Sequence, residues 1–534
     1  MNQARKLPTG IQSFEALRTD GFLYVDKTAM VYQIASTTIP YFLSRPRRFG
    51  KSLLLSTFEA YFEGRKDLFE GLAISELETQ WEKYPVLYLD LNDETYDSVG
   101  SLKAILSDHL DRWEILYGKN ERETTLSRRF SGVIRRAYEK TGKRVVVLID
   151  EYDKPMLSTL LNESLSQKYR TILKAFYGVL KSSGRYLRFI FLTGVTKFAQ
   201  VSVFSDLNHL VDISHKDDYT SLCGVTKNEL LQFFKPELEK LANKHELTFD
   251  EAVAKMTQQY DGYHFAYRSE GVFNPFSILN ALKFSDFDNY WFNSVEGCAV
   301  QTGTPTYLVN LLKESDYDLR QLVDGIEVQS FSFTEYRADK TNPIPMIYQS
   351  GYLTIKDYDK KYSMYTLGFP NEEVRYGFID FLTPYYTSVT TDKTGFHIAN
   401  FCKELEAGKT DDFMKRLKVF FAKIPYELNN ENERHYQAIF YVVFTLVGQY
   451  IDAEVRSADG RVDAVVKTKD YIYVFEFKLN GTAEEAIQQI DRKDYLLPYT
   501  LDGRKLVKIG VDFCKEKRNI NNFIAIEELT LPRI

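Results

Sequence analysis

The feature that most constrains this chain is the loop RPRRFGKS, residues 45–52, which separates an apolar run from a helical pattern. The run Ile39–Leu43 is typical of a buried strand, and Leu54 and Phe58 fall on one side of the helix that follows. A strand, a tight loop with Gly-Lys-Ser and a helix form an arrangement that binds nucleotide phosphates, because backbone N–H groups at the helix start cradle the anion. The pattern therefore predicts a phosphate-binding loop.

The same loop supplies candidate contacts for a nucleotide. We expect Lys51 to reach the outer phosphates and the Ser52 hydroxyl to bind Mg²⁺. The candidate nucleotide-binding residues run from the loop into the first helical turn: Arg47, Arg48, Phe49, Gly50, Lys51, Ser52 and Leu53. The usual consensus has a glycine five residues before Gly50, a position that Arg45 occupies here. The alternative interpretation is a basic surface turn that precedes a core helix.

A second strand pattern carries the carboxylates that such a loop needs. In RVVVLIDEYDKP the apolar run Val145–Ile149 leads into Asp150 and Glu151. We expect Asp150 to hold Mg²⁺ through water and Glu151 to activate the attacking water as a general base. An exposed acid pair that caps the next helix is the alternative. The two motifs lie about a hundred residues apart in an alternation of strands and helices, which favours ATP binding.

A further strand is expected at Arg188–Phe198, and its carboxyl end offers Thr193 and Lys197. Ligands bind at the carboxyl ends of strands in parallel α/β sheets. Thr193 is therefore the candidate sensor of the γ-phosphate, and Lys197 is a weaker one. A last strand at His209–His215 would complete the sheet, and the alternation of elements predicts a mostly parallel sheet with helices on both faces.

Later segments change in character. Residues 1–215 are expected to form the nucleotide-binding domain, and helical patterns over 216–299 indicate a lid. Residues 300–385 contain two short strands joined by a polar turn and followed by a helix, which suggests a winged-helix-like module that bridges domains. Residues 386–534 would form a C-terminal domain.

Composition limits the class of protein. The 534 residues include 68 Lys and Arg against 74 Asp and Glu, so any contact with nucleic acid must come from local basic surface. The four cysteines are scattered without a C-x-x-C pair, which argues against a zinc finger and fits a reducing cytoplasm. No signal peptide and no apolar run of membrane-spanning length stand out. We expect a cytoplasmic protein without a membrane partner.

A second candidate site lies in GRVDAVVKTKDYIYVFEFKLN. Two strand patterns flank the short turn TKD, and a symmetric fold about the turn places Asp463 opposite Glu476. Lys478 shares the face of Glu476 through the two-residue period of a strand. A register slip of one residue would destroy this arrangement.

Two carboxylates and a lysine at this separation suit metal-dependent hydrolysis of a phosphodiester. Asp463 and Glu476 would hold Mg²⁺ or Mn²⁺, and Lys478 would orient water or neutralise charge on the phosphate. Glu433, near the start of an upstream apolar helix, is a further candidate ligand, and Gln489 on the downstream helix would lie near the hairpin. An exposed salt bridge between Lys478 and one of the acids is the alternative.

Ten segments together resemble a bacterial family whose members fuse an AAA-ATPase-like P-loop domain to a C-terminal domain of the PD-(D/E)XK nuclease superfamily. These are LPTGIQSFEALR, YVDKT, RPRRFGKSLLLSTFEAYF, LIDEYDKP, TGVTKFAQVSVFSDLN, YDGYHF, FNPFSILNAL, GRVDAVV, FEFK and AIQQIDRKDY. The similarity covers nearly the whole chain, and an arginine-rich loop without the first glycine is typical of the family. The resemblance implies an α/β fold: a P-loop NTPase parallel sheet with a helical lid and a winged-helix-like linker, plus a C-terminal α/β nuclease-like domain.

For the first domain the resemblance implies that Lys51 and Ser52 contact phosphate and Mg²⁺, and that Asp150 and Glu151 are the Walker B pair.

For the C-terminal domain it implies that Asp463, Glu476 and Lys478 are the metal and catalytic residues, supported by Gln489. The proline that normally precedes the first nuclease aspartate is Val462 here.

The combined prediction is an ATPase with a Mg²⁺- or Mn²⁺-dependent nuclease-type domain that acts on nucleic acid, with DNA favoured. The alternative is a nucleotide-controlled switch or scaffold whose nuclease-like domain binds without cleaving. A kinase that uses the P-loop is a third reading, for which no second-substrate motif is present. The oligomeric state stays open.

Overall fold

The structure is a computed structural model. It describes residues 5–92, 94–159, 162–197, 210–292, 308, 312, 325–329, 342–386, 391–422, 433–455, 463–479, 481–514 and 519–528. The chain divides into two compact units, Met1–Leu308 with Glu327–Asn371, and Val309–Ile326 with Glu372–Ile534. The four-part division expected from the sequence is finer than these units and stays a prediction. Among the described helices, none is long and apolar enough to cross a membrane.

The first unit is built on a five-stranded sheet in the order β2-β3-β4-β1-β5, and every pair is parallel. Its strands are β1 (Tyr41–Ser44), β2 (Val86–Asp90), β3 (Val145–Asp150), β4 (Leu187–Gly194) and β5 (Val211–Asp212). The parallel sheet predicted from the alternation is thus confirmed. Strand β4 ends at Gly194, before Thr196 and Lys197, and β5 is shorter than predicted, with His209 outside the described residues.

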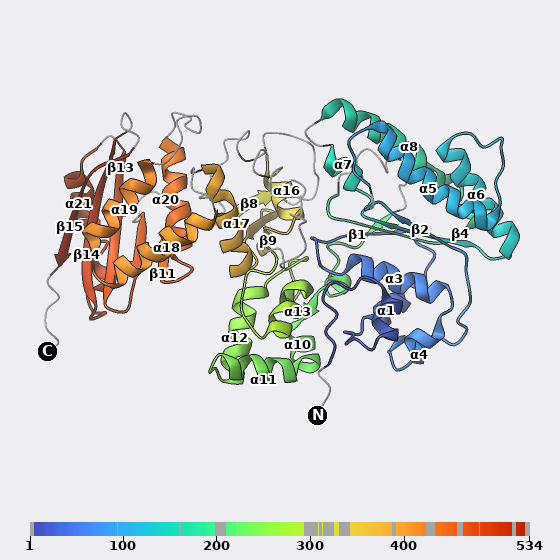
Figure 1. Ribbon diagram of the computed structural model, residues 1–534, viewed down its shortest axis with the longest axis horizontal. Coiled ribbons are helices and arrows are strands. Elements are labelled where there is room, and N and C mark those ends of the chain that lie inside the picture. Colours follow the sequence, from blue (N-terminus) through green and yellow to red (C-terminus); the bar gives the residue numbers. More distant parts are fainter. Residues whose placement is uncertain are drawn as a thin grey trace. The chain divides into compact units, whose positions relative to one another are not determined.

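Helices cover both faces of this sheet (Figure 1). They are α1 (Phe14–Thr19), α2 (Thr28–Ala35), α3 (Lys51–Phe62), α4 (Ile74–Leu77), α5 (Val99–Tyr117), α6 (Leu126–Thr141), α7 (Lys154–Ser158) and α8 (Glu163–Ser182). On one face α5, α6 and α8 enclose an apolar core in which Phe130 stacks on Phe176 with ring centroids 4.5 Å apart. On the other face α3 packs on β4, and the ring centroids of Phe58 and Phe191 lie 4.9 Å apart. This burial of both faces explains why the five residues from Val145 to Ile149 are all apolar.

The helical segment predicted after the sheet is present. Its elements are β6 (Val225–Thr226), α10 (Lys227–Phe233), α11 (Lys235–Lys244), α12 (Phe249–Tyr260), β7 (Val272–Phe273) and α13 (Pro275–Phe284). Capping boxes begin two of the helices, Thr226 with Glu229 and Thr248 with Glu251, which is why α10 and α12 start where they do. We call this segment the lid.

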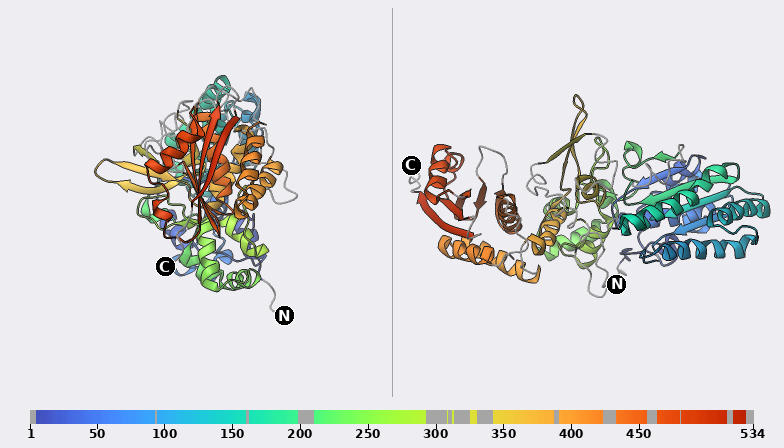
Figure 2. Two further views of the ribbon diagram at one scale, coloured as in Figure 1. Left: turned by 90° about the vertical axis from the view of Figure 1, so that its left-hand side faces the viewer. Right: turned by 90° about the horizontal axis from the view of Figure 1, so that it is seen from above.

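The first unit ends with a short helix and a hairpin. These are α16 (Ile344–Gln349), β9 (Thr354–Asp359) and β10 (Met364–Gly368), and β8 (Ile326–Gln329) pairs with β10. Figure 2 shows β9 and β10 as a projecting two-stranded ribbon. Tyr358 and Tyr365 face each other across it, with ring centroids 4.3 Å apart. The two short strands and the helix expected after them are present.

The second unit has a helical part, α17 (Glu372–Tyr386), α18 (Thr391–Glu406), α19 (Thr410–Ala422) and α20 (Glu433–Val447), and a mixed sheet. The sheet order is β11-β12-β13-β14-β15, from β11 (Asp452–Val455), β12 (Ala464–Lys467), β13 (Tyr471–Leu479), β14 (Lys505–Cys514) and β15 (Asn519–Glu528). Among the described strands of this sheet, β13 and β14 alone pair in parallel, and α21 (Ala483–Arg492) is the crossover between them. This α/β arrangement agrees with the predicted C-terminal fold.

Candidate functional site

The loop between β1 and α3 turns into the helix through a glycine. Gly50 is the N-cap residue of α3 and has a φ of 89°, a left-handed conformation that side-chain-bearing residues rarely adopt. A glycine cap has no side chain to bond the first N–H groups of the helix, and these groups favour an anion. The predicted strand–loop–helix is therefore present with the helix start that phosphate binding requires.

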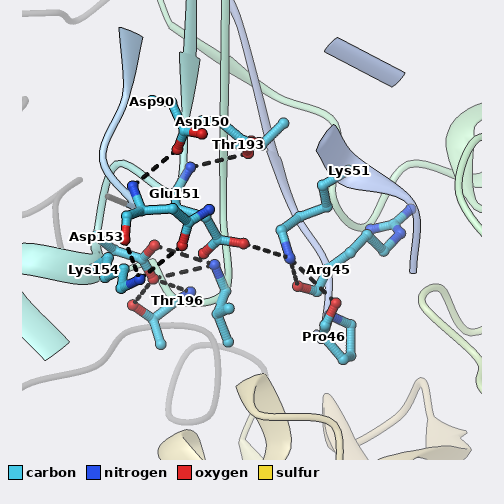
Figure 3. A network of polar contacts seen from close by, with 12 residues as sticks. Arg45, Pro46, Lys51, Asp90, Asp150, Glu151, Asp153, Lys154, Thr193 and Thr196 are labelled. Carbon is cyan, nitrogen blue, oxygen red and sulfur yellow. Dashed lines mark hydrogen bonds and ion pairs between the residues drawn. The ribbon is translucent and has the colours of Figure 1, made fainter. Parts of the chain in front are cut away.

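Lys51 is the first residue of α3 and is 4 % exposed. Its Nζ donates to the carbonyl oxygens of Arg45 at 3.2 Å and Pro46 at 3.3 Å, and it lies 3.2 Å from Glu151 Oε1 (Figure 3). Glu151 follows β3 with a φ of 49°. The loop lysine and the second acid of β3 thus meet directly, which places both predicted motifs in one site.

Asp150, the last residue of β3, is held by two hydroxyl groups. Thr193 Oγ1 donates to Asp150 Oδ1 at 2.5 Å, and the Ser52 hydroxyl also bonds this carboxylate. Burial and the charge of Glu151 raise the pKa of Asp150, while the two hydroxyl groups act against that rise. The structure therefore places Ser52, Asp150 and Thr193 together. Thr193 positions the acid, and its contact with a γ-phosphate stays a prediction.

Lys197, the weaker sensor candidate, forms an ion pair with Asp212. Its Nζ pairs with Asp212 Oδ2 at 2.7 Å in a buried environment. Burial lowers the pKa of Lys197 and the charge of Asp212 opposes that effect.

Asp153 was missed by the sequence reasoning, although it is the third acid of the DEYD run. It is fully buried, and its Oδ2 accepts hydrogen bonds from Thr196 N at 2.6 Å, Thr196 Oγ1 at 2.6 Å and Val195 N at 3.1 Å. Burial and the nearby Glu151 raise the pKa of Asp153 to about 6. Asp153 fixes the turn that follows β4, as Figure 3 shows.

Arg45 occupies the position of the usual first glycine, and its side chain packs inward. It is 1 % exposed, and its guanidinium donates to the carbonyl oxygens of Ser214 at 2.8 Å and Tyr219 at 3.0 Å. The same group lies over the ring of Phe265, 4.0 Å from its centroid. Arg45 therefore ties the loop to the segment after β5 and to the lid.

Other predicted loop contacts also face the lid. Arg48 has a φ of 65°, and its guanidinium lies 3.9 Å from the ring centroid of Phe276. Phe49 is buried and packs edge-on against Tyr263 at 4.8 Å. Arg47 is partly exposed. The side chains of Arg48 and Phe49 thus contact lid aromatics, and their predicted contact with a nucleotide stays a prediction.

A mostly apolar cavity of about 110 Å³ lies beside Gly50 and Leu53. The N-terminal segment, the loop with α3, and the lid all line it; the lining includes Leu23, Tyr24, Val25, Leu54, Thr57, Leu222, Val225, Phe234 and Leu279. An apolar slot next to a phosphate-binding helix start suits the flat ring of a nucleotide base.

The C-terminal hairpin has the register that a symmetric turn predicts. Ala464 pairs with Phe475 and Val465 with Val474 in antiparallel strands, so Asp463 comes opposite Glu476. Asp463 Oδ2 accepts a hydrogen bond from Phe477 N at 2.8 Å. On the face of the hairpin that carries Glu476, α21 packs against Val465 and Val474. This face is therefore partly covered by a helix and not fully exposed to solvent.

Glu476 is the centre of this second cluster and is 3 % exposed. Lys478 Nζ lies 3.3 Å from Glu476 Oε1, Gln489 Nε2 donates to the same oxygen, and Lys478 Nζ also donates to Gln489 Oε1 at 2.5 Å. Burial and the charge of Asp463 raise the pKa of Glu476 to about 7. The predicted residues Asp463, Glu476, Lys478 and Gln489 are thus brought together.

The residues of this cluster fit a divalent cation. Glu476 Oε2 is buried and has no hydrogen-bond partner among the described residues, next to a second carboxylate. An oxygen in that state is stabilised by a hard cation such as Mg²⁺ or Mn²⁺. Within the described part of the chain no three acidic, histidine or cysteine side chains gather into a metal site. Glu433 begins α20, but its side chain lies outside the described residues.

Tyr495 is a second residue that the sequence reasoning missed. Burial raises the pKa of its hydroxyl, and the charges of Glu476 and Asp463 add to the rise, so the ring lies near the acid pair. The conventional alternatives for both sites required exposed acids. Asp150 is 1 % exposed, which argues against the alternative at the first site. At the second site the ion pair of the alternative is present between Lys478 and Glu476, but Glu476 is 3 % exposed and the pair is therefore not a surface salt bridge.

Family models match two parts of the chain. Residues 8–204 match the AAA-ATPase-like family, described as a predicted AAA-ATPase, and residues 431–523 match the PD-(D/E)XK nuclease superfamily. The chain is 33 % identical to an uncharacterized protein in the vnfD 5' region of Azotobacter chroococcum mcd 1, over 98 % of this chain and 99 % of that protein. A structure of the Aeropyrum pernix ORC2 protein (ADPNP-ADP complexes) matches 67 % of this chain and 88 % of its own, with 12 % identity and a TM-score of 0.22. The chain belongs to the family that joins an AAA-ATPase-like domain to a C-terminal PD-(D/E)XK nuclease-superfamily domain.

Proposed function

We propose that the first unit binds ATP with Mg²⁺ and hydrolyses it. The observation that carries this proposal is the meeting of Lys51 Nζ and Glu151 Oε1 at 3.2 Å beside the start of α3. Lys51 would exchange its loop carbonyl partners for the outer phosphates, and Ser52 and Asp150 would hold Mg²⁺, which neutralises phosphate charge when bound. Glu151 is then free to accept a proton from the attacking water.

The cavity of about 110 Å³ supports a base-binding role. It begins at Gly50 and Leu53, where the loop becomes helix, so one ligand can contact both the apolar slot and the helix start. Tyr24 and Val25 come from the N-terminal segment and Val225 from the lid. Binding of the base between these two segments would favour a closed lid.

The second unit acts, in this proposal, as a metal-dependent nuclease-type domain on nucleic acid, with DNA favoured. Asp463 and Glu476 would hold Mg²⁺ or Mn²⁺. When bound, the ion would lower the pKa of a water molecule attached to it and polarise the phosphate. Lys478 would orient that water, and Gln489 keeps Lys478 and Glu476 in place through its two hydrogen bonds. We place the protein in the cytoplasm, in keeping with its scattered cysteines.

A nucleotide-controlled switch that binds nucleic acid without cleaving it is the second candidate. One observation favours it: both Lys478 and Gln489 already contact Glu476 Oε1. A cation would have to compete for the carboxylate or use Oε2 and Asp463.

A plasmid-nicking experiment separates the two candidates. The full-length protein is incubated with supercoiled plasmid and Mg²⁺ or Mn²⁺, with and without ATP, beside Glu476→Gln and Glu151→Gln variants. Nicking that Glu476→Gln abolishes supports the nuclease. ATP turnover that Glu151→Gln abolishes, without nicking by any form, supports the switch. Neither turnover nor nicking contradicts both.

A further inference from the structure

The turn at the end of α16, residues 349–351, contacts both halves of the nucleotide site. We call it the α16 turn. Gln349 is 6 % exposed and Ser350 is 5 % exposed, although both are polar. Buried polar side chains in a turn require partners. The Ser350 hydroxyl donates to Met346 Sδ within α16, and Gln349 bonds the end of β4.

The first contact reaches the end of β4. Gln349 Oε1 accepts a hydrogen bond from the backbone N–H of Lys197 at 2.8 Å. The preceding residue, Thr196, is bonded through its N–H and hydroxyl to Asp153. Asp153 stands two residues after Glu151, so Gln349 supports the backbone on which the acids of β3 depend.

The second contact reaches the P-loop. Gly351 has a φ of 90°, and a Cβ built on it would lie 2.6 Å from Pro46 Cβ and 2.8 Å from Pro46 Cγ. The carbonyl of Pro46 accepts a hydrogen bond from Lys51 Nζ. The α16 turn therefore lies directly against the residue that holds the loop lysine.

A small cavity marks the same junction. Its volume is about 20 Å³, room for about one water molecule, and Arg45, Pro46, Lys197, His215 and Gln349 are among its lining residues. The P-loop, the end of β4 and the α16 turn therefore border one small space.

We propose that the α16 turn couples the nucleotide site to α16 and the β9–β10 hairpin. Gln349 positions the β3 acids for hydrolysis. Gly351 fixes the position of the P-loop, and with it the binding of ATP. The inference rests on the proposed ATPase function. A ligand that changes the position of Lys51 or Glu151 must, by linkage, bias this turn, and displacement of the turn must change nucleotide chemistry in return. After β10 the chain enters the second unit at Glu372, so the coupled segment precedes one of the points at which the chain passes from one unit to the other.

The test of the Gln349 contact compares Gln349→Met with Gln349→Glu in the full-length protein. Methionine keeps the shape of the side chain and removes the acceptor for Lys197 N–H, whereas glutamate keeps an acceptor oxygen. Gln349→Met is expected to lower kcat for ATP about tenfold, with KM within about twofold of wild type. Gln349→Glu keeps the acceptor but buries a charge, so its kcat should lie between that of wild type and that of Gln349→Met.

The Gly351 contact is tested by Gly351→Ala, with Gly142→Ala as its control. Gly142 has a φ of 68° but nothing within 4 Å of an added Cβ, so it carries the backbone strain without the collision with Pro46. Gly351→Ala should weaken binding of a fluorescent ATP analogue about tenfold, and Gly142→Ala should leave it unchanged. Thermal unfolding of each variant checks that the fold is retained.

Hydrogen exchange supplies a readout that a purely structural role would not change. Amides of residues 344–352 should exchange more slowly in wild type with ATP than without it, and Gln349→Met should lose this difference. If wild type binds and hydrolyses ATP but the Gln349→Met and Gly351→Ala variants match it, the coupling is overturned and the ATPase stands. If wild type binds no ATP, the proposed function fails and the coupling fails with it. If Gln349→Met lowers melting temperature and kcat while the ATP-dependent protection persists, Gln349 is structural only, and the coupling is overturned.

Discussion

Lys51 Nζ and Glu151 Oε1 lie 3.2 Å apart, and this pair joins the phosphate-binding loop to the acids at the end of β3. Lys51 is buried, at 4 % exposed, and the side chain of Glu151 is 16 % exposed. A lysine whose partners are two carbonyl oxygens and one carboxylate can transfer to a stronger anion while its own charge stays paired, and the transfer releases Glu151. Phosphate oxygens would be that anion.

Glu151→Gln should separate binding from hydrolysis. Glutamine keeps the shape and loses the base, so ATP affinity should change little while turnover falls about 10²- to 10³-fold. Single-turnover phosphate release and titration with a fluorescent ATP analogue measure the two quantities. Glu139→Gln on the exposed face of α6 is the control, and equal turnover in both variants would remove Glu151 from the reaction.

Arg45→Gly restores the glycine of the usual phosphate-binding loop, and it should nevertheless lower stability. The substitution removes the buried guanidinium that bonds Ser214 O and Tyr219 O and lies over Phe265. We expect a loss of about 2–4 kcal/mol in the free energy of unfolding, because two buried carbonyl oxygens lose their donor. Urea unfolding measures it. If Arg45→Gly is as stable as wild type, the buried guanidinium of Arg45 does not stabilise the folded state.

Glu476→Gln should change how stability depends on pH in the metal-free protein. Burial and Asp463 raise the folded-state pKa of Glu476 to about 7, above the ordinary value of 4.5. The folded state therefore holds a proton that the unfolded state has lost between these values, and stability from Glu476 is present below about pH 4.5 and lost as pH rises through about 7. At about pH 8 the variant should be more stable than wild type by about 1–2 kcal/mol, less than the full pKa shift implies because solvent screens the charge, and near pH 5 the difference should shrink.

Denaturant unfolding in EDTA at the two pH values makes that comparison. Glu484→Gln on the exposed side of α21 controls for general loss of charge. Parallel pH profiles for wild type and Glu476→Gln would mean that Glu476 is ionised normally.

Mn²⁺ should stabilise the wild-type second unit through Asp463 and Glu476. At a metal concentration a hundred times the dissociation constant, the gain is about 2.7 kcal/mol. Asp463→Asn keeps an oxygen that can accept the Phe477 N–H bond but removes the charge, so its melting temperature should not respond to Mn²⁺. The same upward shift in Asp463→Asn would place the metal elsewhere.

Local periodicity and symmetry account for what the sequence could predict. The turn between Lys469 and Asp470 fixed the pairing of Ala464 with Phe475, because a two-residue period and a short turn leave one register that buries the apolar face. The strand ending in Asp150 was equally local, since an apolar run followed by acids requires no knowledge of the rest of the chain.

Tertiary contacts account for what it could not. In the sequence Arg45 is a basic residue in a loop. Its burial results from contacts with the carbonyl oxygens of residues 214 and 219 and with the ring of Phe265, which are distant in the sequence. Asp153 follows the recognised acids, and only the return of β4 beside β3 brings Thr196 to it. The cover of α21 over Val474 likewise depends on a crossover that the hairpin alone does not specify.

The measurement that tests the central claim most directly is calorimetric titration of Mg²⁺·ATP into the full-length protein and into Lys51→Ala, with Lys103→Ala on the exposed face of α5 as the control. The account predicts one binding event in wild type and in Lys103→Ala, and an affinity at least about a hundredfold lower in Lys51→Ala. Equal binding by Lys51→Ala and wild type would contradict it.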